Sequence, residues 1–327
     1  MTTVDLLQAN LLSPIALAFA LGLLARVVRS EFSLPKDVYL GLSIFLLWAL
    51  GLQGGVELRH SSLQAIAGPA LATVGLGVLT PITTYLVVRR LGRFSTADSA
   101  AIAAHYGSVS AVTFIAASGF VKAQGQEAEG FMPTLLTLLE SPGIAVALAL
   151  GAYHAREGER PVREVMHEVL TGRTMVLLLG GLVVGFLIGD QHWATIGPFY
   201  DTTGAVFRGV LCLFMLEMGV TAGARLGDLR KVGGFLLGFG MLMPLAHGTL
   251  GAWIGQVAGL SVGGATVLGT MAASASYIAA PPAVRLTLPD ANPTYYLTAA
   301  LVITFPFNLL IGIPVYFRVA TWLGGAP

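Results

Sequence analysis

Two stretches of the chain, His105-Tyr-Gly-Ser-Val-Ser-Ala-Val-Thr113 and Ala272-Ala-Ser-Ala-Ser-Tyr-Ile-Ala-Ala-Pro-Pro282, place a Ser-x-Ser pair beside glycine or proline within apolar sequence. Gly107 can adopt the left-handed conformation that ends a helix. Serine is a favoured N-cap, the residue that precedes the first turn of a new helix. We therefore expect each stretch to interrupt a helix near its middle.

The rest of the chain has the composition of a membrane protein. Of its 327 residues 55% are hydrophobic and 11% are charged, whereas soluble domains carry about 25% charged residues. The mean hydropathy is +0.78. These values exclude a soluble enzyme and a disordered chain, and the single cysteine, Cys212, excludes a disulfide scaffold. A net charge of +1 gives no basic face for nucleic acid.

Ten segments are long and apolar enough to cross a membrane as helices, which takes about 20 residues. Of the 18 Lys and Arg residues, all but Arg59, Lys122, Arg208 and Arg318 then fall in loops on one side, the inside, so both termini are expected outside. Met1–Asn10 has no Lys or Arg and is not expected to be a secretory signal. The segments are Leu12–Val28, Val38–Val56, Ala65–Val88, Ala100–Phe120, Phe131–Tyr153, Thr174–Gly189, Thr203–Gly223, Gly233–Val257, Val262–Leu286 and Thr294–Ala320.

The two halves of the chain repeat the same small motifs in the same order. Because each half holds an odd number of spans, the second copy enters the membrane from the opposite side. The predicted fold is an all-α polytopic membrane protein whose ten transmembrane helices form a five-plus-five inverted repeat with broken, crossing helices four and nine. Residues 1–155 form the first repeat, 156–172 a cytoplasmic linker and 173–327 the second repeat. The matching pairs, 160 to 168 positions apart, are Gly51/Gly219, Gly77/Gly240, Pro81/Pro244, Ser108/Ser274, Ser110/Ser276, Pro133/Pro293 and Pro142/Pro306.

The two interruptions predict an anion site. Spans four and nine run in opposite directions, so their breaks bring two helix N-termini to the middle of the membrane. Free N–H groups at such ends carry partial positive charge and bind small anions. The simpler alternative is that the serines bond to the preceding turn or hold helices together. The candidate anion-binding residues are Gly107, Ser108, Val109, Ser110, Ser274, Ala275 and Ser276.

A cation site is predicted beside them. Glu140 lies deep in span five, where a charged side chain costs about 3 kcal/mol or more and indicates function. Pro142 and Pro306 would each free a backbone carbonyl, although a packing kink explains a proline equally well. Sodium, a hard cation, prefers such oxygen ligands. The candidate sodium ligands are Ser108, Ser110, Glu140, Ser274, Ser276, Thr304 and Asn308.

Glu217 and His105 are titratable residues that also fall inside spans. Glu217 in span seven is either a gate residue or a protonated acid that bonds to a neighbouring helix. His105 has no second ligand at metal spacing, which favours a hydrogen-bonded packing role over a metal site. We expect no transition metal and no cofactor other than sodium, the co-transported ion.

The two serine stretches, together with Leu211-Cys-Leu-Phe-Met-Leu-Glu-Met-Gly219 and the segment Asn292–Asn308, resemble the sodium-dependent bicarbonate transporter family of cyanobacteria and other bacteria. The resemblance implies an elevator-type symporter of the bacterial inner membrane, in contact with lipid and assembled as a homotrimer. Spans one, two, six and seven would form a gate domain and the others a core domain, with bicarbonate and sodium at the crossing of spans four and nine. Cyanobacterial members are regulated by a PII-like protein on the cytoplasmic face, which makes such a protein a candidate partner.

Three alternatives stay open at this point. The same machine can carry another small anion, such as a carboxylate, because N–H groups do not distinguish these anions by residue type. A sodium/proton antiporter needs no anion. An intramembrane serine protease would use Ser108 with His105, but no Gly-x-Ser-x-Gly elbow is present.

Overall fold

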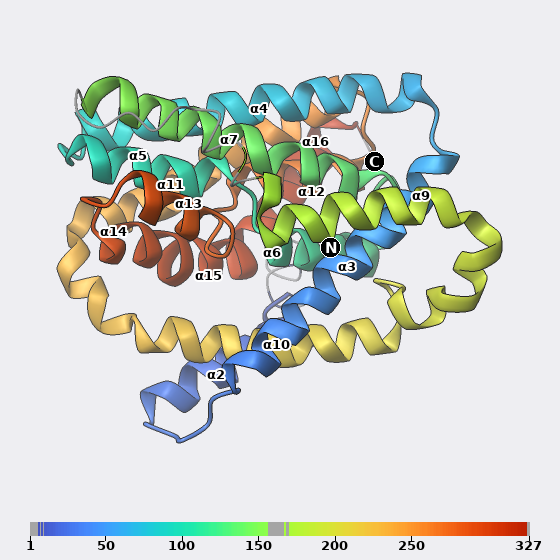
Figure 1. Cartoon of the computed structure of the whole chain (residues 1–327), viewed down its shortest axis with the longest axis horizontal. Coiled ribbons are helices and arrows are strands. Elements are labelled where there is room, and N and C mark those ends of the chain that lie inside the picture. Colours follow the sequence, from blue (N-terminus) through green and yellow to red (C-terminus); the bar gives the residue numbers. More distant parts are fainter. Residues whose placement is uncertain (1–5, 7, 9, 156–166, 168–169, 326–327) are drawn as a thin grey trace.

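The computed structural model describes residues 6, 8, 10–155, 167 and 170–325, and every element in this part is helical. Most of the predicted linker, 156–172, lies outside the described residues. Figure 1 shows the arrangement. The main helices are α2 (Pro14–Val27), α3 (Lys36–His60), α4 (Leu63–Arg90), α5 (Thr96–Gly107), α6 (Ala111–Ala123), α7 (Met132–Ala155), α9 (Arg173–Tyr200), α10 (Ala205–Ala224), α11 (Leu229–Val257), α12 (Val262–Ala273), α13 (Ala280–Thr287), α14 (Pro293–Leu297), α15 (Phe305–Phe307) and α16 (Ile313–Leu323).

Short 3-10 and π-helical turns complete the described chain. The 3-10 turn η1 (Leu226–Asp228) joins α10 to α11. Two π-helical runs, η2 (Thr298–Thr304) and η3 (Asn308–Gly312), flank α15. Pro306 lies between these runs, so the wide turns occur where a proline disturbs the regular α-helical hydrogen bonds.

Seven helical stretches in the described part are long and apolar enough to cross a membrane. This confirms the prediction of an all-helical chain with several membrane-crossing helices. One of the stretches, Ala205–Val257, contains both α10 and α11, and two shorter apolar helices, Pro14–Val27 and Val262–Ala273, add to the set. The others are Lys36–His60, Leu63–Arg90, Thr96–Ala123, Met132–Gly151, Arg173–Tyr200 and Pro293–Leu323.

Two predicted span ends coincide with bends inside longer helices. α9 continues past the predicted end at Gly189, where the backbone turns through φ 60°. α11 starts before the predicted beginning at Gly233, where φ is 72°. Only glycine adopts such angles freely. The apolar criterion therefore located the bends, and helical turns continue beyond them through more polar sequence.

The helices pack as two groups. α3 lies along α9, α10 lies along α2, and α10 also contacts α3 and α9. In the second group α4, α5 and α7 pack against one another, and α11 packs against α12 and α16. α7 contacts both groups through α3 and α9. In Figure 1, α10 and α2 lie along the lower edge of the molecule and α4 along the upper edge.

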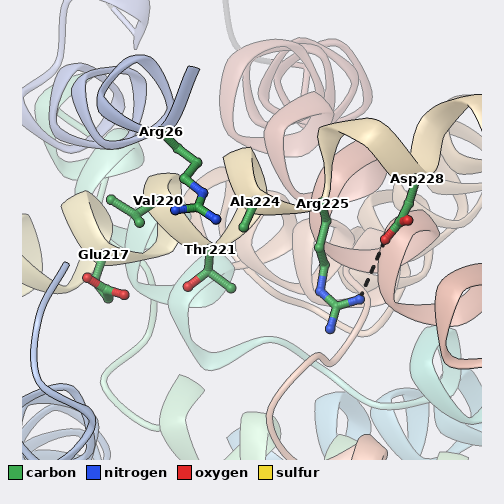
Figure 2. Close-up of a pocket in the computed structure, with 7 residues that line it drawn as sticks. All are labelled: Arg26, Glu217, Val220, Thr221, Ala224, Arg225 and Asp228. Carbon is green, nitrogen blue, oxygen red and sulfur yellow. Dashed lines mark ion pairs between the residues drawn. The ribbon is translucent and has the colours of Figure 1, made fainter. Parts of the chain in front are cut away.

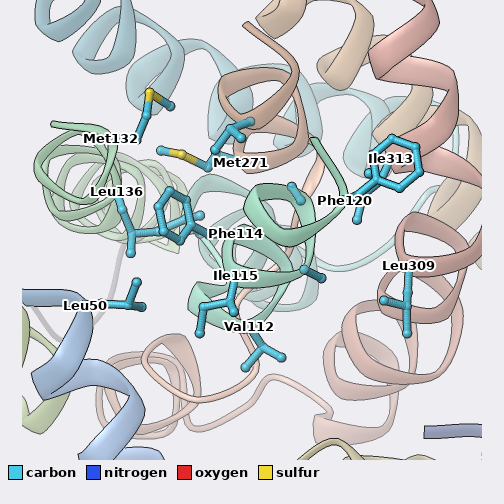
Figure 3. Packing of buried hydrophobic residues seen from close by; sticks show 14 of the residues in the cluster. Leu50, Val112, Phe114, Ile115, Phe120, Met132, Leu136, Met271, Leu309 and Ile313 are labelled. Atoms are coloured by element: carbon cyan, nitrogen blue, oxygen red, sulfur yellow. The ribbon is translucent and has the colours of Figure 1, made fainter. Parts of the chain in front are cut away.

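Helix α6 lies at the centre of the larger apolar cluster, seen in Figure 3. Its Val112, Phe114 and Ile115 are buried, and the cluster includes Leu50 of α3 and Leu136 of α7. Side chains from both helix groups thus enclose α6. This packing holds the N-terminus of α6 at a defined position inside the molecule.

Candidate functional site

The first serine stretch separates two helices. α5 ends at Gly107 and α6 begins at Ala111. Between them the backbone is extended, with φ −106° and ψ 144° at Ser108 and φ −97° and ψ 112° at Ser110. The second stretch behaves similarly, because α12 ends at Ala273, Ser274 is extended (φ −81°, ψ 163°) and α13 begins only at Ala280. We call residues 108–110 and 274–279 the first and second interruptions.

The two interruptions are hydrogen-bonded to each other. The N–H of Ser110 donates to Oγ of Ser274 over 2.9 Å. The N–H of Ser276 donates to the carbonyls of His105 (2.7 Å) and Ser108 (3.1 Å). Oγ of Ser274 in turn donates to the carbonyl of Met271 over 2.8 Å. Backbone groups that leave the helices are thus satisfied by the opposite interruption, as buried polar groups require.

A serine of each interruption also bonds to N–H groups at the start of the helix that follows it. Oγ of Ser110 accepts from the N–H of Thr113 over 3.3 Å at the start of α6. Oγ of Ser276 accepts from the N–H groups of Ala279 (3.2 Å) and Ala280 (3.3 Å) at the start of α13. Ser110 therefore caps α6, as the sequence pattern predicts. Ser276 is not the N-cap of α13, because Ala279 holds that position without a side-chain cap bond.

A close approach of backbones brings α7 to the first interruption. A Cβ built on Gly107 would lie 2.8 Å from Cβ of Pro81 and 3.0 Å from Cα and O of Gly143. Only glycine at position 107 allows α4 and α7 to approach this closely. Gly143 follows Glu140 by less than one helical turn, so this contact places the Glu140 carboxyl beside the serines.

A small cavity lies where these elements meet. It leaves about 20 Å³ for a water-sized sphere, enough for one water molecule or a bare ion of similar size. Its lining comes from the first interruption, the second interruption, the start of α6, α7, α3 and α9. The lining residues are Leu47, Val109, Ser110, Ala111, Glu140, Thr174, Ser276, Tyr277, Ile278 and Ala279.

The cavity has an unmatched acceptor and an unmatched donor. Glu140 is 2% exposed, and its Oε2 has no hydrogen-bond partner in the described part of the chain. Ala111 is the first residue of α6, and its N–H has no acceptor among the described residues. A buried carboxylate without a partner requires a cation or a proton. A free N–H at a helix start favours an anion.

The remaining residues of the predicted anion set lie close by. Val109 lines the cavity, whereas Ser108 and Ala275 are buried outside its lining. Oγ of Ser108 has no partner among the described groups. His105 donates or accepts through Nδ1 at the carbonyl of Ala101 (2.7 Å) and stacks on the ring of Tyr296 (centroids 4.4 Å apart). Its ring thus has a packing role, and it does not bond to Ser108.

Thr304 and Asn308 lie elsewhere. Thr304 donates to the carbonyl of Gly240 over 2.7 Å and also bonds to the hydroxyl of Tyr106. Asn308 donates to the carbonyl of Ala273 (2.8 Å) and accepts from the hydroxyl of Tyr316 (2.9 Å). Neither side chain lines the cavity. Asn308 instead anchors the end of α12, directly before the second interruption.

Glu217 faces a different pocket, shown in Figure 2. Its Oε2 accepts from the N–H of Leu34 over 2.8 Å, in the connection between α2 and α3. The pocket is open, with a volume of about 500 Å³, and shares no residue with the cavity at the interruptions. It is lined by Arg26, Glu217, Val220, Thr221, Ala224, Arg225 and Asp228, and Arg225 forms an ion pair with Asp228 at 3.9 Å.

Six lining residues were not predicted as site residues: Leu47, Ala111, Thr174, Tyr277, Ile278 and Ala279. Tyr277 belongs to the quoted second stretch, but its aromatic ring gave no sign of a role there. Leu47 and Thr174 belong to α3 and α9 and reach the cavity only through packing between helices. Their sequence neighbourhoods contain no motif that distinguishes them from other apolar spans.

The model of the Na⁺-dependent bicarbonate transporter superfamily matches residues 14–321 of the chain. The chain belongs to this superfamily. The match covers both interruptions, Glu140 and both helix groups, so it confirms the resemblance inferred from the motifs. The superfamily consists of transporters and not of enzymes, which removes the serine protease alternative. A comparison with individual curated proteins gave no match.

Proposed function

We propose that this superfamily member carries bicarbonate into the cell together with sodium. The observation that carries the proposal is the cavity, where an unpartnered carboxylate oxygen of Glu140 and a free N–H of Ala111 lie between two hydrogen-bonded interruptions. An anion and a cation bound together satisfy both groups. The proposed anion ligands are the N–H groups at the start of α6, and the proposed sodium ligands are Glu140, Ser110 and Ser276.

We propose the ten-span inverted repeat as its architecture, with α5–α6 and α12–α13 as the interrupted fourth and ninth spans. The contacts at the interruptions support a two-fold relation. Exchanging 108 with 274 and 110 with 276 turns the contact between Ser110 and Ser274 into one between Ser276 and Ser108. Both contacts are present, the first with Oγ of Ser274 as acceptor and the second with the carbonyl of Ser108.

Other contacts follow the same exchange. A Cβ on Gly77 would meet Cδ1 of Leu139 at 3.4 Å, and one on the matching Gly240 would meet Cγ2 of Ile303 at 2.6 Å. Thr83 of α4 and His247 of α11 bond to each other over 2.8 Å. The offset of the Gly77/Gly240 and Pro81/Pro244 pairs matches Thr83 to Ala246, the residue before His247. A contact between nearly equivalent positions lies near the axis, so this bond supports an axis between α4 and α11.

The outer helices pair in the same manner. α3 packs on α9, and α10 packs on α2, as an exchange of spans one with six and two with seven requires. A Cβ on Gly55 would lie 2.9 Å from Cα of Gly185, and one on Gly219 would lie 3.0 Å from Cα of Gly22. Small residues at such crossings allow helices in lipid to pack by close backbone contact.

We propose an elevator-type mechanism in which α2, α3, α9 and α10 form the gate and the other helices form the moving core. Leu47 and Thr174 of the gate close the cavity against core residues. The described cavity holds one water-sized body, so bicarbonate requires this boundary to open. Movement of the core past the gate would open it.

The remaining features of the proposal come from the positive-inside pattern and the family. We propose a bacterial inner-membrane protein with both termini outside, assembled as a homotrimer. A PII-like protein is a proposed cytoplasmic partner. Thr304 and Asn308, which are already hydrogen-bonded within the protein, are proposed to support the site and not to bind sodium in this conformation.

The test is uptake of labelled bicarbonate into proteoliposomes with and without an inward sodium gradient. We expect sodium-dependent uptake that Ser110→Ala, Ser276→Ala and Glu140→Gln reduce. Ser118→Ala is the matched control, because Ser118 also lies on α6 but bonds only to the carbonyl of Phe114.

The same assay distinguishes the alternatives. Absence of sodium-dependent uptake in the wild type rejects bicarbonate symport. Competition by a carboxylate favours the other small-anion symporter. Sodium efflux that depends on pH and needs no anion favours the antiporter.

A further inference from the structure

Tyr277 stands in the second interruption and lines the cavity. Its ring packs edge-on against Phe305, with centroids 5.4 Å apart and planes at 73°. Its hydroxyl oxygen lies 3.5 Å from Oγ of Ser110, which belongs to the first interruption. The phenol therefore reaches across the cavity from one interruption to the other.

The hydroxyl hydrogen of Tyr277 has no acceptor among the described residues. In the contact with Ser110 the serine hydroxyl is the donor, and the 3.5 Å separation is at the outer limit of a hydrogen bond. Oγ of Ser110 already accepts from the N–H of Thr113. A buried tyrosine hydroxyl usually finds a partner. Here the free O–H borders the same cavity as the free N–H of Ala111.

The backbone donors near the start of α13 lie on the same side of the cavity as Tyr277. In the first turn of α13, the N–H groups of Ala279 and Ala280 are taken up by Oγ of Ser276. Pro281 and Pro282 follow and have no N–H. The N–H groups of Tyr277 and Ile278, which precede α13 and line the cavity, have no acceptor among the described residues, and the same holds for the N–H of Ala111. Both interruptions therefore offer the cavity free backbone donors, and the hydroxyl of Tyr277 lies beside them.

We propose that the hydroxyl of Tyr277 donates a hydrogen bond to the transported anion, in addition to the free backbone N–H groups that border the cavity. This inference rests on the proposed function, because it assigns a ligand within the same site. The anion would be held between the N–H of Ala111 on one side and the O–H of Tyr277 on the other. Sodium would be held by oxygen ligands, with Glu140 as the charged one.

The test measures the Kd of bicarbonate for the purified full-length protein at saturating sodium by isothermal titration calorimetry. Tyr277→Phe keeps the ring and its packing on Phe305 and removes only the hydroxyl. A hydrogen bond to a charged group contributes enough to predict an increase in the bicarbonate Kd of about 10- to 100-fold. The sodium Kd, measured at saturating bicarbonate, should stay unchanged. Tyr39→Phe is the matched control, because that hydroxyl contacts the sulfur of Met218 outside the cavity.

Each result bears on the assignment. A weaker bicarbonate Kd in Tyr277→Phe alone, with unchanged sodium binding and unchanged thermal unfolding, supports it. Wild-type bicarbonate affinity in Tyr277→Phe overturns it and leaves the proposed function standing. A loss of sodium affinity in place of bicarbonate affinity also overturns it, because the phenol oxygen would then be a cation ligand. If the wild type binds no bicarbonate, the proposed function fails together with this inference.

Discussion

Replacing Gly107 by alanine tests whether the contact between α5, α4 and α7 determines the geometry of the site. The added Cβ would lie 2.8 Å from Cβ of Pro81 and 3.0 Å from Cα and O of Gly143, whereas ordinary contacts begin at 3.4 Å. All three atoms belong to a proline ring or to backbone, so the end of α5 has to move by about 0.5 Å. Overpacking of this kind costs about 1–3 kcal/mol, and the better helix propensity of alanine returns up to about 1 kcal/mol.

The same movement affects the bond between the interruptions. The carbonyl of Ser108, directly after Gly107, accepts from the N–H of Ser276 at 3.1 Å. A shift of about 0.5 Å away from Ser276 takes this contact beyond hydrogen-bond range. We therefore expect Gly107→Ala to lower both the stability of the protein and its uptake rate.

The measurements are the thermal unfolding midpoint in detergent and initial bicarbonate uptake in proteoliposomes. Gly119→Ala is the matched control, because Gly119 lies in α6 and an added Cβ there meets nothing within 4 Å. We expect Gly119→Ala to unfold at or slightly above the wild-type temperature and to transport normally. If Gly107→Ala matched the wild type in both measurements, the close approach would not control the site.

Three further predictions concern other buried polar groups. Glu140→Gln should abolish the dependence of uptake on sodium, measured as initial rate against sodium concentration, and an unchanged curve would exclude Glu140 as a sodium ligand. Asn308→Ala should lower the thermal unfolding midpoint, because it leaves the carbonyl of Ala273 and the hydroxyl of Tyr316 without partners at a cost of about 1–3 kcal/mol. Glu217→Ala should speed hydrogen exchange at the N–H of Leu34, because the variant lacks the carboxylate that this group donates to. A lost hydrogen bond of this kind is worth about 1 kcal/mol, so we expect bicarbonate uptake to stay within about two-fold of the wild type. Slow exchange at Leu34 in the variant would contradict the anchoring role.

The sequence could indicate those parts of the site that depend on local chemistry. Gly107 and the capping serines mark where α5 ends and where α6 begins, because helix ends have short-range signals. Glu140 could be singled out because an acid is rare within an apolar span. Each of these features is decided within a few residues of the position concerned.

Features decided by contacts between distant helices could not be predicted in this way. Thr304 and Asn308 follow the pattern of sodium ligands beside Pro306, yet their side chains bond to α11 and α12. Glu217 was expected to be a gate residue or to bond to a neighbouring helix, and its partner is instead the N–H of Leu34 in a connection. Thr174 reaches the cavity only because α9 packs there.

The shared cavity has an energetic consequence for coupling. Moving one anion into a cell with a negative interior costs about 2.3 kcal/mol per 100 mV. One sodium ion that moves with it cancels this electrical term, so the sodium concentration gradient is then available to accumulate the anion. Glu140 and Ala111 line the same cavity, so once the proposed movement of the core has opened it, a cation at the first and an anion at the second would be close neighbours. Each ion would lower the cost of removing the other from water, which makes joint binding more favourable than separate binding. In the proposed symport, coupling would therefore require no long-range signal, because the attraction between the two ions would link their binding.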